Sequence, residues 1–95
     1  MFVERWTYRV KARSKRGALI KLSKDWIEQC GVTGRVYLCI YGTRDTVSLD
    51  LEFETVEACQ EFWRDFFDRP EAMGIVEKLE DLIDPVHTRE ILRLC

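Results

Sequence analysis

The sequence predicts an α+β fold in which an antiparallel sheet is covered by helices on one face. Residues 46–53 alternate strictly between polar and apolar side chains, which is the period of a half-buried strand. Residues 36–41 form an apolar, β-branched and aromatic run of strand length. The connection between these two runs, Gly-Thr-Arg-Asp at 42–45, is typical of a β-hairpin. Segments with helical period precede and follow this hairpin.

The first element, at residues 2–13, is predicted to be a strand with one apolar and one basic face. Trp6, Tyr8 and Val10 alternate with Arg9 and Lys11. If this strand neighbours the strand at 46–53, we expect its basic side chains to pair across the sheet with acidic ones. Each such pair contributes roughly 0.2–1 kcal/mol to the stability of the sheet. The expected pairing brings together Arg9, Lys11 and Arg13 on one strand and Asp50, Glu52 and Glu54 on the other.

Residues 15–30 are predicted to form the first helix, with Ser14 as its N-cap and Gly31 as its C-terminal glycine. Thr55 is the expected N-cap of a second helix, which carries a dense aromatic stripe. The sequence Asp-Arg-Pro at 68–70 breaks this helix near Pro70, after which an apolar face continues to residue 84. Residues 86–95 are a last strand with irregular alternation, which favours an edge position.

The resulting order, βαββαβ, is that of a ferredoxin-like domain spanning residues 1–95. In this topology the first and third strands are central, and the helices cover their apolar face. That face carries Trp6, Tyr8, Val10, Val47, Leu49, Leu51 and Phe53. The opposite face is expected to present Arg9, Lys11, Tyr37, Tyr41, Asp50 and Glu52.

Composition excludes several classes of protein. The chain is 46% hydrophobic and 34% charged, and it has neither a signal-peptide pattern nor an apolar run of membrane-spanning length. We therefore expect a soluble, cytoplasmic protein that does not associate with membranes. The four cysteines form no CxxC pair and the single histidine, His87, has no HxxxH partner, so no metal site is predicted.

Charge is distributed unevenly along the chain. Residues 1–44 contain ten Lys and Arg against three Asp and Glu, whereas residues 45–95 contain five against fourteen. Because both halves are patterned as folded elements, we expect them to pair with each other, within one chain or across a dimer. RNA binding is not expected, because the exposed face of the strand at 46–53 carries Ser48, Asp50 and Glu52 instead of aromatic side chains.

The order of elements, the first strand RWTYRV at 5–10 and the passage FWRDFFDRPE at 62–71 resemble the dimeric α+β barrel superfamily. That superfamily includes NIPSNAP-like, antibiotic-biosynthesis monooxygenase-like and stress-responsive barrel domains. The resemblance covers almost the whole chain, although no catalytic motif is matched. It implies a homodimer whose two sheets pack face to face and enclose a barrel without a tightly held cofactor. The residues that would line or plug this interior are Arg9, Lys11, Tyr37, Tyr41, Asp50, Glu52 and His87.

Two functions remain open at this point. The first is a small-molecule site, monooxygenase- or isomerase-like, in which His87 is the candidate catalytic residue because histidine is the side chain best suited to proton transfer near neutral pH. The second is a non-catalytic assembly domain whose sheet face serves dimerisation. An interior filled by satisfied ion pairs would favour the assembly role, and a partly empty apolar interior would favour the enzyme.

Overall fold

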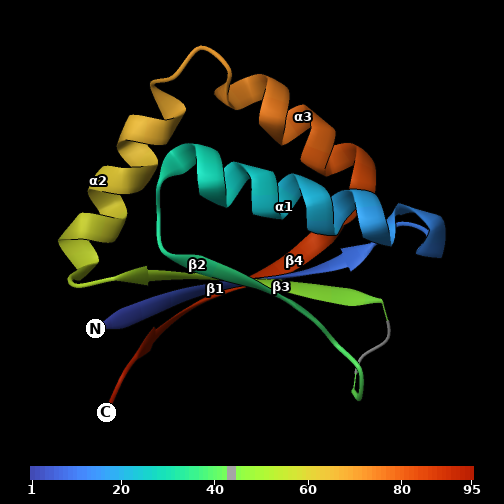
Figure 1. The fold of residues 1–95 in the computed structure, drawn as a ribbon, viewed down its shortest axis with the longest axis horizontal. Coiled ribbons are helices and arrows are strands. Elements are labelled where there is room, and N and C mark those ends of the chain that lie inside the picture. The colour runs from blue at the N-terminus through green and yellow to red at the C-terminus, as the bar shows by residue number, and fades with distance from the viewer. Residues whose placement is uncertain (43–44) are drawn as a thin grey trace.

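The computed structural model describes residues 1–42 and 45–95, and Figure 1 shows a twisted sheet with helices on one side of it. The elements are β1 (Phe2–Val10), a 3-10 turn (Arg13–Lys15), α1 (Arg16–Cys30), β2 (Gly34–Leu38), β3 (Thr46–Phe53), α2 (Val56–Phe67), α3 (Ala72–Leu82) and β4 (Ile83–Arg93). The strand order is β2-β3-β1-β4, and all neighbouring pairs are antiparallel. The predicted order of elements and the central position of β1 and β3 are confirmed.

The helices pack on the apolar face of the two central strands, as the alternation predicts. Tyr8 and Val10 of β1 are buried there, together with Val47, Leu49, Leu51 and Phe53 of β3. Trp6 is half-buried and packs against both parts of the core. Leu19 and Trp26 of α1 and Cys59 and Phe66 of α2 complete the core from above.

Two helix ends lie where the sequence predicts them, at Gly31 and at Thr55. Gly31 adopts φ 66°, the left-handed conformation that glycine allows without steric cost, and ends α1. The Thr55 hydroxyl accepts a hydrogen bond from the Ala58 amide at 3.0 Å and caps α2. The predicted break near Pro70 is present, because α2 ends at Phe67 and α3 begins at Ala72.

Several predicted boundaries are wrong, and the first strand ends at Val10 and not at residue 13. Ser14 does not cap α1, because the chain first makes a 3-10 turn and the helix starts at Arg16 without a side-chain cap. The second helix was expected to reach residue 84 but α3 ends at Leu82, and β4 already runs through Pro85. The residue before a proline is biased toward extended backbone, and an edge strand tolerates the absence of an N–H group at Pro85. Both effects move the boundary between α3 and β4 toward the N-terminus.

The hairpin strand β2 is shifted toward the N-terminus relative to the prediction of 36–41, since it covers Gly34–Leu38. The predicted turn at 42–45 includes residues 43 and 44, which lie outside the described residues. No helix in the described part of the chain is long and apolar enough to cross a membrane.

The predicted cross-strand charge pairs are wrong, because the register aligns the start of β1 with the end of β3. Arg5 stands opposite Asp50, Val3 opposite Glu52, and Arg9 opposite Thr46. Lys11 and Arg13 lie beyond the end of β1. The two oppositely charged halves of the chain do meet within the protein. The ion pairs between them are Arg5–Asp50 at 2.8 Å, Arg9–Asp84 at 3.9 Å, Lys15–Asp81 at 3.7 Å and, with the signs reversed, Glu4–Arg89 at 2.6 Å.

Candidate functional site

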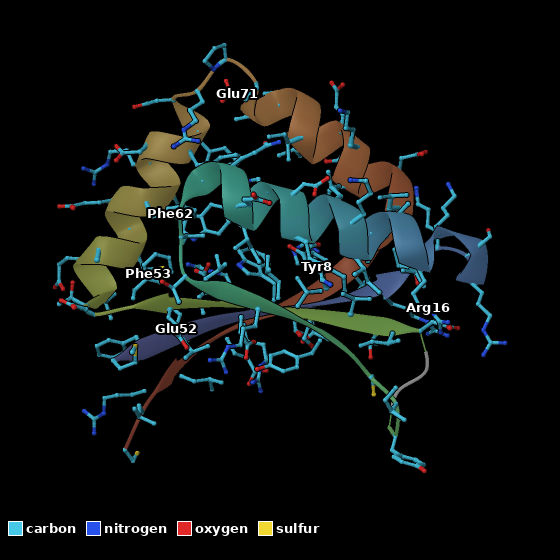
Figure 2. The ribbon with its side chains drawn as sticks, in the orientation of Figure 1. Tyr8, Arg16, Glu52, Phe53, Phe62 and Glu71 are labelled. Atoms are coloured by element: carbon cyan, nitrogen blue, oxygen red, sulfur yellow. The ribbon has the colours of Figure 1, made fainter. Side chains whose placement is uncertain are left out.

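A cavity of about 590 Å³ lies between the sheet and the helices, and we call it the aromatic pocket. Strands β1, β3 and β4 line it from the sheet, and α1, α2 and α3 line it from the opposite side. Figure 2 shows Tyr8 in this layer, between the sheet and α1. Six aromatic side chains line the pocket: Trp6, Tyr8, Trp26, Trp63, Phe66 and Phe67.

The mouth of the pocket opens between β4 and the helices α2 and α3. The exposed side chains among its lining residues are His87 and Arg89 from β4, Gln60 and Phe67 from α2, and Glu80 from α3. The buried lining residues belong to the central strands, to the helices and, with Ile83, to the start of β4. A molecule of small size could therefore enter past β4 and lie on an aromatic floor.

Glu4 is buried beside this floor, with 1% of its surface exposed. Its Oε1 accepts hydrogen bonds from the indole Nε1 atoms of Trp6 at 2.8 Å and Trp63 at 2.7 Å. Its Oε2 accepts from Nε and Nη2 of Arg89 at 2.9 and 2.6 Å, and from the Cys59 thiol at 3.3 Å. Both oxygens act only as acceptors and every neighbour donates, which is the arrangement of an ionised carboxylate.

Arg89 joins this network to the mouth of the pocket. It stands opposite Trp6 in the register, and its guanidinium carbon lies 5.4 Å from the centre of the Trp6 ring. The hydrogen bonds to Glu4 raise the pKa of the Arg89 side chain, so the guanidinium stays charged. Because 45% of this side chain is exposed, Arg89 contacts both the buried carboxylate and the pocket.

Two further groups have perturbed acidity next to Glu4. Burial raises the pKa of the Tyr8 phenol far above its ordinary value, and the negative charge of Glu4 adds to the effect. Burial also raises the pKa of the Cys59 thiol to about 11, again with a contribution from Glu4. Tyr8 is therefore a neutral hydroxyl in the pocket wall, and Cys59 is a thiol and not a thiolate.

His87, the candidate catalytic residue, lies at the mouth of the aromatic pocket. It pairs with Tyr8 across β1 and β4, and its ring centre lies 5.5 Å from that of Trp6 and 5.4 Å from that of Tyr8. The structure thus places the ring of the only histidine in the sequence against Trp6 and Tyr8 on the helix-covered face, whereas the family resemblance implied the opposite face.

The other predicted site residues lie away from the aromatic pocket. Asp50 accepts two hydrogen bonds from Arg5, both of 2.8 Å. Both residues lie on the face of the sheet opposite the helices, which we call the open face. Glu52 and Tyr37 belong to the same face, by their register partners Val3 and Ser48. Lys11 follows β1, where its amide donates to the carbonyl of Leu82 at 3.0 Å.

Tyr41 is 95% exposed beyond the end of β2. Arg9 and His87 both line a shallower hollow of about 460 Å³ on the open face, which also includes Cys39, Val86 and Glu90. Among the described residues, no group of three or more His, Cys, Asp or Glu side chains could hold a metal ion.

Sequence reasoning missed Glu4 and Arg89, although one signal for Glu4 was present. Glu4 is in phase with Trp6 and Tyr8 on the apolar face of β1, so a charged residue occupies an inward position. A buried charge requires hydrogen-bonding partners, and an inward-facing charged residue therefore marks a candidate functional site. The identity of the partner, 85 residues away in sequence, depends on the register of β4.

Comparison with known proteins agrees with this fold. No protein-family model and no curated protein matches the sequence. An uncharacterised NIPSNAP domain protein from Burkholderia xenovorans has a TM-score of 0.84 and 16% identity, over 100% of this chain and 95% of its own. A NIPSNAP family protein from Agrobacterium tumefaciens has a TM-score of 0.80 and 16% identity, over 97% and 90% of the two chains. A candidate antibiotic biosynthesis monooxygenase from Nitrosomonas europaea has a TM-score of 0.73 and 13% identity, over 98% and 97%.

At these identities the likeness shows the fold alone. The ferredoxin-like α+β fold, and the predicted resemblance to NIPSNAP-like and antibiotic-biosynthesis monooxygenase-like domains, are confirmed at that level.

The raised pKa of Cys59 predicts a difference in reactivity between two cysteines of the folded protein. At pH 8 a thiol with a pKa of about 11 is only about 0.1% thiolate, so alkylation of Cys59 by iodoacetamide should be at least ~100-fold slower than that of the exposed Cys95. Mass spectrometry of the peptides measures both rates. In denaturant the two rates should converge, which serves as the control. Equal rates in the folded protein would contradict the buried thiol.

Proposed function

We propose that this protein binds a small, flat aromatic molecule in the aromatic pocket and transforms it as a monooxygenase- or isomerase-like enzyme without a tightly held cofactor. The observation that carries the proposal is the cavity of about 590 Å³ walled by six aromatic side chains. Ligand sites are commonly clefts of roughly 300–1,000 Å³ with apolar walls and a few polar groups. Aromatic walls favour planar ligands because rings stack or meet edge to face.

A buried polar group supports a ligand with an oxygen atom. Trp26 lines the pocket and is buried, and its Nε1–H has no hydrogen-bond partner among the described residues. An unpaired buried donor costs roughly 1–3 kcal/mol, which a ligand acceptor would recover. The carboxylate of Glu4 nearby is, by contrast, already satisfied by Arg89 and needs no ligand.

The chemistry that fits this site begins with a proton transfer. Isomerisation of an enol starts when a base removes an acidic proton from the substrate, and so does oxygenation of a phenol by molecular oxygen, in which the substrate itself supplies the electrons that reduce the second oxygen atom to water. His87 at the mouth can accept such a proton, and Tyr8 beside it can donate a hydrogen bond to the substrate oxygen. The likeness in fold to a candidate antibiotic biosynthesis monooxygenase is consistent with this reaction class.

We also propose that the open face of the sheet forms a homodimer interface. The Arg5–Asp50 pair on this face is closed by two 2.8 Å hydrogen bonds, which leaves a ligand few free polar groups there. Tyr37, Val86 and Leu92 expose apolar surface on the same face. A second copy of the sheet would cover these side chains about a two-fold axis.

The pocket proposal predicts that 2-naphthol, a flat and neutral aromatic probe, binds with a Kd between about 1 μM and 1 mM. Val76 of α3 lines the pocket, so Val76→Trp should fill it and weaken binding at least ~10-fold. Met73→Trp, on the exposed surface of the same helix, is the matched control and should bind as the wild type does. Isothermal titration calorimetry measures all three, and a wild type that does not bind would refute the function.

The interface proposal predicts a solution mass of twice the chain mass by light scattering, at protein concentrations of about 10 μM. Val86→Glu introduces a charge on the open face and should shift the protein toward the monomer, whereas Met73→Glu on α3 should not. A wild type with the mass of one chain would argue against the face-to-face dimer. A stable dimer that binds no aromatic probe would instead favour the non-catalytic assembly role.

A further inference from the structure

We infer that the buried Glu4–Arg89 pair makes the aromatic pocket selective for neutral aromatic molecules with an acceptor oxygen, and against carboxylates of the same shape. This inference rests on the proposed function and specifies its substrate class. It follows from how the charges at the pocket are already paired. An arginine at the mouth of an apolar pocket would ordinarily suggest an anionic ligand, because guanidinium groups bind carboxylates through two hydrogen bonds.

Arg89 is already engaged in that way by the protein. Its Nε and Nη2 atoms donate to one oxygen of Glu4 at 2.9 and 2.6 Å. The fork that would bind a ligand carboxylate side-on is therefore occupied by an internal one. A guanidinium has five N–H groups, so others remain for a single acceptor oxygen. The hydrogen bonds from Arg89 to Glu4 use Nε and Nη2 and not Nη1.

The carboxylate of Glu4 also cancels the charge of the guanidinium. Glu4 is 1% exposed and receives two indole N–H bonds and a thiol S–H bond, so it cannot turn away into solvent. A ligand anion in the pocket would meet one cation and one fixed anion at nearly the same place. Glu80 at the mouth adds a second negative group, and His87 is the remaining titratable group there.

Desolvation then decides between an anion and a neutral acceptor. A carboxylate that leaves water loses hydration worth several kcal/mol, and it needs a net positive partner to recover it. The Glu4–Arg89 pair supplies no net charge. A neutral carbonyl or phenol oxygen loses far less hydration and can accept from Arg89 or from the Nε1–H of Trp26, which has no acceptor in the described part of the chain.

The test compares two probes of the same shape, 2-naphthamide and 2-naphthoate, by calorimetric titration of the full chain in one buffer. Wild type should bind 2-naphthamide at least ~10-fold more tightly than 2-naphthoate. Glu4→Gln leaves Arg89 without its counter-charge and should move this ratio at least ~10-fold toward 2-naphthoate. Arg89→Gln leaves Glu4 unpaired and should weaken 2-naphthoate further.

Asp50→Asn is the matched control. It removes a carboxylate from the equivalent pair with Arg5 on the open face and should leave the ratio unchanged. If Glu4→Gln does not fold by circular dichroism, the wild-type ratio and Arg89→Gln decide the question. A wild type that binds 2-naphthoate as tightly as 2-naphthamide, or a folded Glu4→Gln with an unchanged ratio, would overturn the selectivity alone. A wild type that binds neither probe would overturn the proposed function and the inference together.

Discussion

The hydrogen-bonded carboxylate of Glu4 is the interaction on which the pocket depends. A charge removed from water costs several kcal/mol unless hydrogen bonds replace its hydration, and here five hydrogen bonds from four side chains do so. The donors come from β1, α2 and β4, so one buried group ties the middle of the sheet, its edge and a helix together. An edge strand is otherwise paired along one side only. The position of Arg89 at the pocket mouth therefore follows from a charge buried on a different strand.

The two faces of the sheet have different surroundings because of this arrangement. Under the helices, the strands form the floor of an aromatic cavity with a histidine at its mouth and an indole N–H, that of Trp26, that finds no hydrogen-bond partner among the described residues. On the open face, the Arg5–Asp50 pair closes on itself and leaves exposed apolar side chains around it. A cavity suits a small ligand, whereas a sheet face whose Arg5–Asp50 pair is already closed suits another sheet. The proposal accordingly assigns ligand binding to the first face and association to the second.

Much of the fold could be predicted from short-range patterns, because alternation and caps act over a few residues. The strict alternation at 46–53 identified the central strand β3, and Thr55 and Gly31 marked helix ends through local hydrogen bonds and backbone conformation. The boundaries predicted from Ser14 and Pro85 are wrong, because a 3-10 turn accommodates Ser14 and an edge strand accommodates Pro85. The site could be predicted only in part. Glu4 alternates in step with Trp6 and Tyr8, which predicts that it faces the core. Its contact with Arg89 depends on the register between β1 and β4, two strands whose contacting residues are 85 positions apart in the sequence.

The central claim is that the ligand occupies the helix-covered face of the sheet, and nuclear magnetic resonance of the ¹⁵N-labelled protein with 2-naphthol tests it most directly. We predict that the indole N–H signals of Trp6, Trp26 and Trp63 shift during the titration, because these side chains line the pocket. The backbone amide signal of Tyr41 should not shift, because that side chain is 95% exposed and lines neither the aromatic pocket nor the hollow on the open face. Shifts confined to the open face, around Arg9 and Val86, with unchanged indole signals would contradict the account.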